Sequence, residues 1–174
     1  MADEKRLRVF LDANILIRGT TLPRFPYEVL RHAARGDFIA VFSPMVLGSA
    51  RLYIQELFPD YREALEVLLE LLKGELVPEP LPEEVAAHGS LMRDAKDIPA
   101  ALAAIHASVD YLVSTDRDST DVDETTAELR QHLKPLRVGT FLREIMGWTS
   151  EALSAIEHRQ WSDIERPFWE PLGS

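Results

Sequence analysis

Short, continuously apolar segments alternate with stretches of helical periodicity along this chain, and this alternation is the feature that most restricts its fold. The apolar runs read VFL at 9–11, FIAVFS at 38–43 and YLVST at 111–115. Runs of this kind are typical of strands that are buried on both faces, as in a parallel sheet. Parallel strands need crossover connections, which are usually helices, so the pattern predicts an α/β fold, a three-layer α/β/α sandwich with a mainly parallel central sheet.

The segments between these runs carry the helices and turns that such a sheet needs. Helices are expected over 25–36, after Pro44, over 60–74, from Pro82 to about 92, over 98–109, near 123–133 and over 140–147, with a last short strand around 136–138. The helix over 60–74 is expected to be capped by Asp60 and to end at Gly74. The helix after Pro44 should bury one stripe made of Val46, Leu47, Ala50, Tyr53, Ile54 and Leu57.

Length and composition favour one domain followed by an extension. A chain of 174 residues, 46% of them hydrophobic, is long enough for one core and too short for two ordinary domains. We expect residues 1–147 to form this domain and residues 148–174 to form a C-terminal extension with one helix that begins at Thr149 or Ser150. The aromatic residues of the extension are expected to pack on the domain; they are Trp161, Phe168 and Trp169.

Composition also excludes several classes of protein. The absence of cysteine excludes a disulfide framework and thiolate chemistry. No apolar run is long enough for a membrane span, and MADEKRLR at the start lacks the apolar core of a signal peptide. A cytoplasmic protein with no membrane partner is therefore expected. The formal charge of −10 argues against broad, nonspecific attraction to nucleic acid, but acids that hold metal ions contribute to that charge themselves.

Four acidic residues are expected to meet at one edge of the sheet. Asp12 ends the first strand, Asp97 begins a helix, and Asp116 and Asp118 follow the strand at 111–115. In a parallel α/β sheet the carboxyl ends of strands and the amino ends of helices share one edge, which is where such folds place their sites. Carboxylates held close together need a positive charge between them, and an all-oxygen ligand set indicates Mg²⁺ or Mn²⁺.

Each of these residues also has a purely structural interpretation. Asp12 and Asp97 could simply cap the helices that follow them, because Asp is a favoured cap residue. Three arginines lie close in sequence to the expected edge and could contact phosphate groups, or could only increase solubility; they are Arg18, Arg51 and Arg117.

Three blocks of the chain can be compared with known families: VFLDANILIRG, DAKDIPAALAAIHASVDYLVSTDRD and LRVGTFLREI. They resemble the blocks of PIN-domain proteins, and most closely those of the PIN-family toxins of bacterial toxin–antitoxin systems, and the resemblance covers roughly residues 7 to 147. It implies a ribonuclease that depends on Mg²⁺ or Mn²⁺, with RNA as substrate, an antitoxin protein as a candidate partner and a homodimer as a candidate assembly.

The resemblance also assigns roles to individual residues. Asp12, Asp97 and Asp116 match the metal-binding acids of the family, and Asp118 matches a frequent additional one. Asn14 and Ser114 match the polar residues that usually support the site.

One position departs from the family pattern. After Ser43 and Pro44 the family carries a Glu in the first turns of the helix, and Ser49 stands at that position here. Glu56 lies about 10 Å further along the helix axis and is too far from the edge to replace it. Asp94 and Asp121 are better placed in the sequence. Because a Ser in place of a Glu removes one negative charge, we expect weak metal binding, with low activity, a preference for Mn²⁺ or no activity.

Two functions from other classes remain as alternatives. A PIN domain that has lost catalysis would act as a module that binds nucleic acid or a partner, and Ser49 supports this hypothesis. A phosphotransfer enzyme could use Asp12 as its nucleophile, but that chemistry calls for a second Asp two residues later, where this chain has Asn14.

Overall fold

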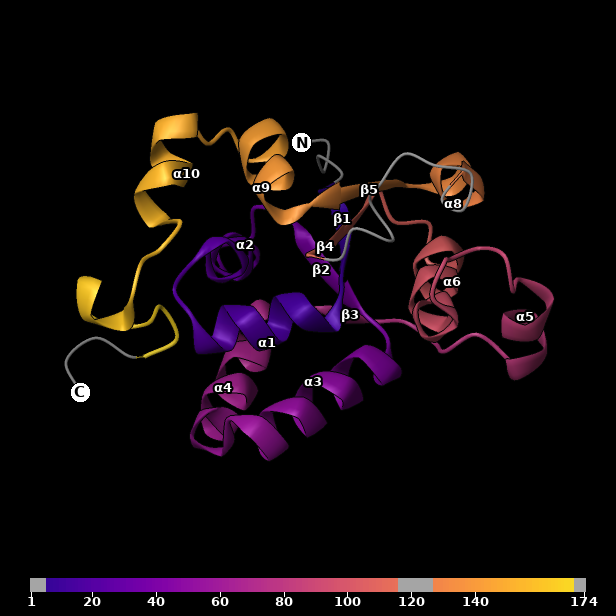
Figure 1. Cartoon of the computed structure of the whole chain (residues 1–174), viewed down its shortest axis with the longest axis horizontal. Helices are drawn as coiled ribbons and strands as arrows, with labels where there is room; N and C mark the ends of the chain where they lie inside the picture. Colours follow the sequence, from indigo (N-terminus) through magenta and orange to yellow (C-terminus); the bar gives the residue numbers. More distant parts are fainter. Residues whose placement is uncertain (1–5, 116–126, 171–174) are drawn as a thin grey trace, which may run out of the picture.

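Five parallel strands form one sheet at the centre of the fold (Figure 1). The structure is a computed structural model that describes residues 6–115 and 127–170. The sheet order is β3-β2-β1-β4-β5. The strands are β1 Arg8–Leu11, β2 Ile39–Phe42, β3 Glu75–Leu76, β4 Tyr111–Ser114 and β5 Lys134–Arg137.

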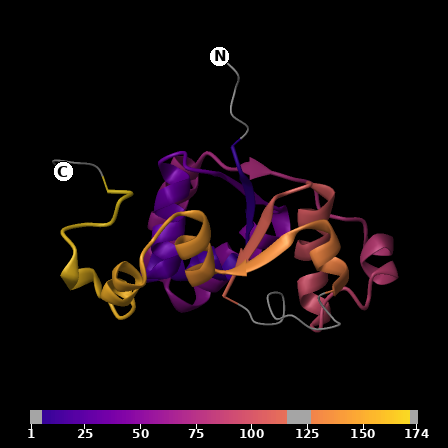
Figure 2. The same ribbon diagram turned by 90° about the horizontal axis from the view of Figure 1, so that it is seen from above.

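Helices cover both faces of this sheet, which confirms the predicted three-layer α/β/α fold. Figure 2 shows α1 and α2 on one side of the strands and α6 and α8 on the other. The helices are α1 Ala13–Thr21, α2 Phe25–Ala34, α3 Pro44–Leu57, α4 Arg62–Leu72, α5 Pro82–Ala87, α6 Ile98–His106, α8 Ala127–His132, α9 Val138–Thr140, which continues as a π-helical segment Phe141–Ile145, and α10 Ser150–Ile156. Within the described parts of the chain, no helix is both long enough and apolar enough to cross a membrane.

The position of β1 at the centre of the sheet explains why the apolar run at 9–11 is followed directly by the carboxylate of Asp12. β1 pairs with β2 on one side and β4 on the other, and Val9, Phe10 and Leu11 are fully buried. A strand with neighbours on both edges and helices on both faces offers little room for polar side chains, so its core is continuously apolar. Asp12 is the first residue beyond this buried stretch.

The last strand begins earlier in the chain than the sequence analysis predicted. β5 covers Lys134–Arg137 instead of 136–138, in register with β4 through Lys134 opposite Tyr111. Pro135 makes the start of this strand difficult to predict from the sequence, because proline lacks the backbone N–H that a strand in the middle of a sheet needs. β5 is an edge strand, where a missing N–H is tolerated.

The predicted stripe of α3 is only half correct. Val46, Ala50 and Ile54 are buried, but Tyr53 and Leu57 are 45% and 57% exposed. α3 packs mainly on α1 and α4, so only a narrow strip of its surface is covered. Helical periodicity identified the helix and overestimated the width of its buried face.

The predicted ends of two helices were also wrong. Asp60 lies in a 3₁₀ turn, Pro59–Tyr61, and does not cap α4, which begins at Arg62. α4 ends at Leu72, and the next residue, Lys73, adopts the left-handed conformation with φ of 48°. Gly74 does not end the helix. A glycine is needed there for a steric reason, because a Cβ at this position would lie 2.5 Å from the ring of Phe42. The helix that starts at Pro82 ends at Ala87, before the predicted 92.

The aromatic residues of the C-terminal extension pack on the domain, as predicted. The ring of Tyr27 on α2 lies 5.6 Å from that of Trp161, 5.2 Å from that of Phe168 and 5.8 Å from that of Trp169, measured between centroids. Thr149 caps α10 by accepting a hydrogen bond from the N–H of Ala152. The extension therefore lies against α2 instead of projecting into solvent.

Candidate metal centre at the carboxyl edge of the sheet

Asp12 lies at the edge where β1 ends, and both of its carboxylate oxygens are held. Its Oδ1 accepts a hydrogen bond from the N–H of Ala13 at 2.7 Å, and its Oδ2 accepts one from the hydroxyl of Ser114 at 2.9 Å. Ser114 is the last residue of β4, the strand next to β1, and is buried. Two neighbouring strands therefore fix the orientation of this carboxylate. A carboxylate oxygen has two lone pairs, so one that accepts a hydrogen bond can also ligate a metal ion.

Asp97 does not have the capping role that its sequence position allowed. It ends a short 3₁₀ turn, Ala95–Asp97, directly before α6, and its side chain makes no capping hydrogen bond. Its backbone is already in the helical region, with φ of −89° and ψ of −9°, whereas a capping residue is usually extended. Its Oδ2 is buried. The capping hypothesis is therefore wrong for Asp97.

Asp12, Asp97 and Ser114 line one small cavity. Its volume is about 20 Å³, and its remaining walls come from Met92, Ala100, Ala101 and Leu112. A cavity of this size has room for a single water molecule or a small ion. Carboxylate and hydroxyl oxygens are ligands that hard cations prefer. The side chains present therefore fit Mg²⁺ or Mn²⁺ in size and chemistry.

These side chains do not make a complete set of ligands. Across residues 6–115 and 127–170, no three acidic or histidine side chains are grouped so as to hold a metal ion. Hard divalent cations take six or more oxygen ligands, so water or further residues must supply the rest. Asp116, Arg117, Asp118 and Asp121 lie outside the described residues.

The other predicted site residues lie near this edge but outside the cavity. Asn14 and Arg18 are exposed, one turn apart on α1, so they share one face of that helix. Ser49 is exposed on the second turn of α3 and does not line the cavity. Asp94 pairs with Lys96 at 3.3 Å and does not line the cavity either.

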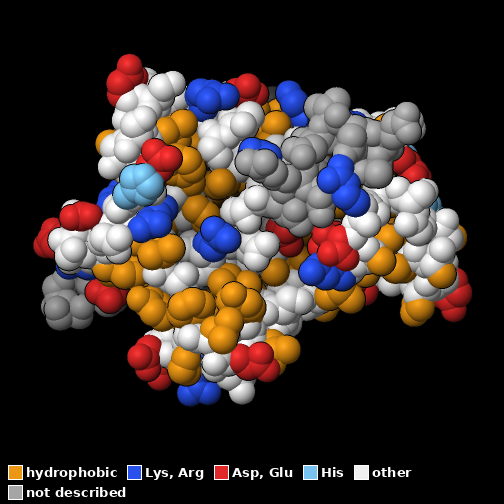
Figure 3. Space-filling view, viewed as in Figure 1, with side chains coloured by type: hydrophobic (Ala, Val, Ile, Leu, Met, Phe, Trp, Pro, Cys, Tyr) orange, Lys and Arg blue, Asp and Glu red, His pale blue; other side chains and the backbone are white. Residues whose placement is uncertain are grey.

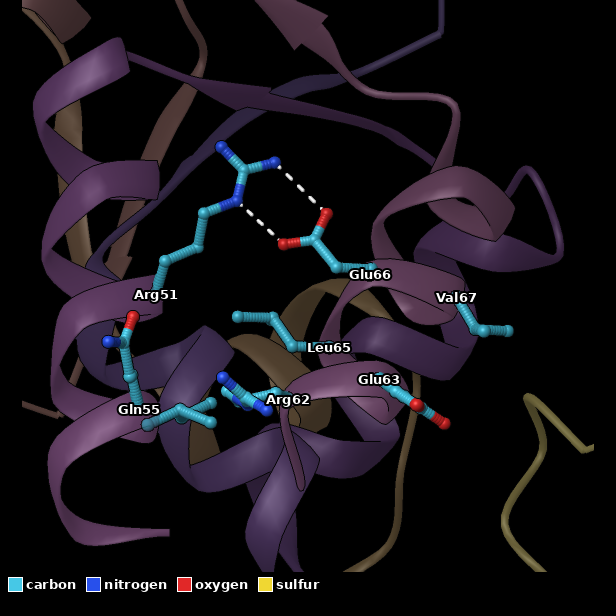
Figure 4. A pocket seen from close by; sticks show the side chains of 8 residues that line it. Arg51, Gln55, Arg62, Glu63, Leu65, Glu66 and Val67 are labelled. Carbon is cyan, nitrogen blue, oxygen red and sulfur yellow. Dashed lines mark hydrogen bonds and ion pairs between the residues drawn. The ribbon is translucent and has the colours of Figure 1, made fainter. Parts of the chain in front are cut away.

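Arg51 lies in a groove between α3 and α4 and is already paired there. Its guanidinium forms two hydrogen bonds with the carboxylate of Glu66, at 2.7 and 3.2 Å (Figure 4). The hydrogen bonds to Glu66 raise the pKa of Arg51. The groove has a volume of about 560 Å³ and is also lined by Arg62 and Glu63. An RNA phosphate at Arg51 would have to compete with Glu66.

Two groups of functional interest were missed by the sequence analysis. Glu79, in the loop after β3, accepts a hydrogen bond from the N–H of Met45 at 2.6 Å. It therefore pairs one of the backbone N–H groups that have no partner within the first turn of α3, at the same edge of the sheet. Arg137 and Arg143 line a second cavity at this edge. No local pattern marks these residues, because only the order of the strands brings them to the edge.

Comparisons with known proteins place the chain in a family. Residues 8–118 match the model of the PIN domain, which covers more than half of the chain. No match was found among curated proteins. A solved structure, VapBC2 from Rickettsia felis bound to a DNA fragment from its promoter, matches with a TM-score of 0.51 and 16% sequence identity over 75% of this chain and 98% of that one. At this identity the match supports the fold alone. Because the family model spans β1, the cavity and β4, the chain belongs to the PIN-domain family.

Proposed function

We propose that this protein is a metal-dependent endoribonuclease of PIN type, which hydrolyses phosphodiester bonds in RNA. The observation that carries the proposal is the meeting of Asp12, Asp97 and Ser114 in one cavity, from three separate parts of the chain. The match of residues 8–118 to the PIN domain supports the same reaction class.

In this proposal Asp12 and Asp97 hold Mg²⁺ or Mn²⁺ together with Asp116 and Asp118, which follow β4 in the sequence. When bound, such an ion polarises the phosphodiester and lowers the pKa of water beside it. Ser114 holds the Asp12 carboxylate in one orientation through its hydroxyl. Asn14 and Arg18 supply a polar amide and a positive charge on the exposed face of α1, where they can orient the substrate.

We further propose that this protein is the toxin of a toxin–antitoxin pair. The structurally similar VapBC2 is a toxin–antitoxin pair, which supports an antitoxin protein as the partner of this chain.

We also propose that the protein forms a homodimer, which light scattering of the purified protein tests. A monomer at every concentration measured would exclude a stable dimer in that range.

Cleavage of end-labelled single-stranded RNA in Mg²⁺, Mn²⁺ or EDTA tests the proposed reaction. We expect cutting with either ion and none in EDTA, because the carboxylates alone cannot stabilise the charge that develops on the phosphate. Cutting that persists in EDTA would exclude this mechanism.

Replacement of Asp97 by Asn should weaken metal binding without loss of the fold. The substitution keeps the size of the side chain and removes one negative charge from the cavity. We expect the affinity for Mn²⁺, measured by calorimetry on the full chain, to fall by at least about tenfold, because a loss of this size already follows when a residue that only orients a ligand is replaced. Asp110→Asn is the matched control, because Asp110 precedes β4 at the opposite edge of the sheet and does not line the cavity. Equal affinities in the two variants would show that Asp97 is not a ligand.

The second candidate function is a PIN domain without catalysis, which binds RNA or a partner. The position of Ser49, exposed on α3 and outside the cavity lining, favours it, because no carboxylate stands where the family has its Glu. A protein that binds RNA tightly but does not cut it with any divalent ion would establish this function.

The Ser49→Glu substitution distinguishes a weakened site from a lost one. α3 starts from the carboxyl end of β2, next to β1, so its first turns lie at the same edge as Asp12. Because Ser49 is exposed, a Glu there meets no steric barrier. We expect Mn²⁺ affinity to rise by roughly tenfold, with a matching rise in cleavage rate. An unchanged affinity would mean that this position does not reach the metal centre.

A further inference from the structure

A second and larger cavity opens at the carboxyl edge of the sheet, beside the acidic one. Its volume is about 480 Å³, and its walls include Thr115, the strand end at Arg137 and the start of α9. Ser114 lines the first cavity and Thr115, the next residue, lines the second, so the two cavities open on opposite faces of the sheet at the end of β4, the first towards α6 and the second towards α2. An RNA strand that crosses the carboxyl edge of the sheet at this point can therefore reach both.

The charged side chains in the wall of this cavity are basic. Arg137 and Arg143 both line it, and no Asp or Glu is among the described residues that do. Arg143 is about half exposed, and a carboxylate oxygen of Glu144 lies 4.0 Å from its guanidinium. Figure 3 shows Lys and Arg side chains interspersed with Asp and Glu on this side of the molecule, and the whole chain has a formal charge of −10. The cavity is thus suited to an anion, in contrast to the acidic cavity beside it.

An aromatic ring completes the wall. Phe25, the first residue of α2, lines the cavity and is partly exposed. It stands over Gly139, where an added Cβ would lie 3.5 Å from the ring. A guanidinium beside an exposed aromatic ring is the combination with which proteins hold single-stranded nucleic acid, since the cation takes the phosphate and the ring stacks on the base.

The C-terminal extension takes part in this wall. Leu153, on α10, lines the cavity opposite the domain. The extension is fixed by the hydrogen bonds of Arg24 to the carbonyl of Arg159 at 3.1 Å and of Trp161 to the carbonyl of Thr21 at 2.9 Å. The extension therefore contributes to the shape of the cavity.

We propose that this cavity binds the nucleotide next to the scissile phosphodiester of single-stranded RNA, with its phosphate at Arg143 and its base on the ring of Phe25. The inference rests on the proposed ribonuclease function for the identity of the ligand. A base paired in a duplex cannot stack on a side chain, so the cavity selects single strands.

Binding of a fluorescently labelled single-stranded RNA, measured by anisotropy in EDTA, tests the cavity apart from cleavage. For Arg143→Ala we expect roughly fivefold weaker binding at 0.1 M salt, and a slope of log K against log salt reduced by about 0.7, because one phosphate contact is lost. Arg35→Ala is the matched control and should change binding less than about twofold. Arg35 is also exposed and also has a carboxylate within 4 Å, that of Asp37 at 3.8 Å, but it precedes β2 at the opposite edge of the sheet.

The ring is tested by Phe25→Leu, which keeps an apolar side chain against Gly139 and removes the stacking surface. We expect binding to weaken by about tenfold, with an unchanged circular dichroism spectrum and melting temperature within a few degrees. Loss of affinity for a duplex of the same length should be much smaller in both variants.

The possible outcomes separate this inference from the proposed function. Binding by Arg143→Ala and Phe25→Leu that equals binding by Arg35→Ala would overturn the cavity assignment, whether or not the protein cuts RNA. Wild-type protein that fails to bind single-stranded RNA, or that binds duplex equally well, would overturn it too. Arg143-dependent binding without metal-dependent cutting would leave the cavity assigned and remove the nuclease.

Discussion

Asp12→Asn should abolish most RNA cleavage, with a loss of about 100- to 1,000-fold in the single-turnover rate at saturating Mn²⁺. A divalent ion contributes several kcal/mol to stabilising the transferred phosphate, and each 1.36 kcal/mol corresponds to a factor of about ten in rate. Asp12 is the carboxylate that two neighbouring strands hold through Ala13 and Ser114, so its loss removes the best-oriented ligand.

The fold should survive this substitution. The Oδ1 of an Asn can still accept from the N–H of Ala13, and the hydroxyl of Ser114 can rotate to accept from the new amide. Thermal unfolding monitored by circular dichroism checks this point.

The matched control for this loss is Asp110→Asn. Asp110 accepts a hydrogen bond from the N–H of Arg8 at 2.8 Å and precedes β4, at the edge opposite to Asp12. We expect its cleavage rate to stay within about twofold of the wild type, because the charge lies far from the proposed centre. Retained cleavage in Asp12→Asn would identify a contaminating nuclease or a site elsewhere, and the proposed metal centre would be wrong.

Arg159→Met should destabilise the protein by about 2 to 4 kcal/mol. Glu28 on α2 is only 2% exposed, and Arg159 from the extension pairs with it at 3.2 Å. Arg159 also lies over the ring of Tyr27, 5.5 Å from its centroid, and donates to the carbonyl of Pro23. Removing one partner of a buried ion pair leaves the other charge poorly compensated. Arg31, which contacts Glu28 at 3.0 Å, limits the loss.

Chemical denaturation and melting curves measure this effect. For a domain of this size, the expected loss corresponds to a decrease in melting temperature of about 5–12 °C. Arg35→Met should change stability by less than about 1 kcal/mol, because its ion pair with Asp37 is exposed. The double variant Glu28→Gln/Arg159→Met should recover part of the loss, since no buried charge is left without its partner. A loss in Arg159→Met no larger than in Arg35→Met would show that the extension does not stabilise the domain.

The amino-acid sequence alone was enough to predict the architecture and part of the site. Apolar runs such as VFL at 9–11 can be accommodated only in a strand covered on both faces, so they predict a parallel α/β sheet from local information. Once the sheet is parallel, the carboxyl ends of its strands share an edge. For this reason the meeting of Asp12 and Asp97 could be predicted from residue order, although the two residues are 85 positions apart.

Other features depended on contacts between distant segments, and no local pattern could show them. Asp97 has the sequence of a helix cap, but it lies in a 3₁₀ turn and its carboxylate lines the cavity. Arg51 looked available for RNA until α4 brought Glu66 against it. Arg137 and Arg143 gained importance only because β5 lies next to β4. Periodicity and capping act over a few residues, whereas strand order and packing act across the chain. The sequence therefore determined the kind of sheet and which edge bears the acids, and the tertiary structure decided which charges are available there.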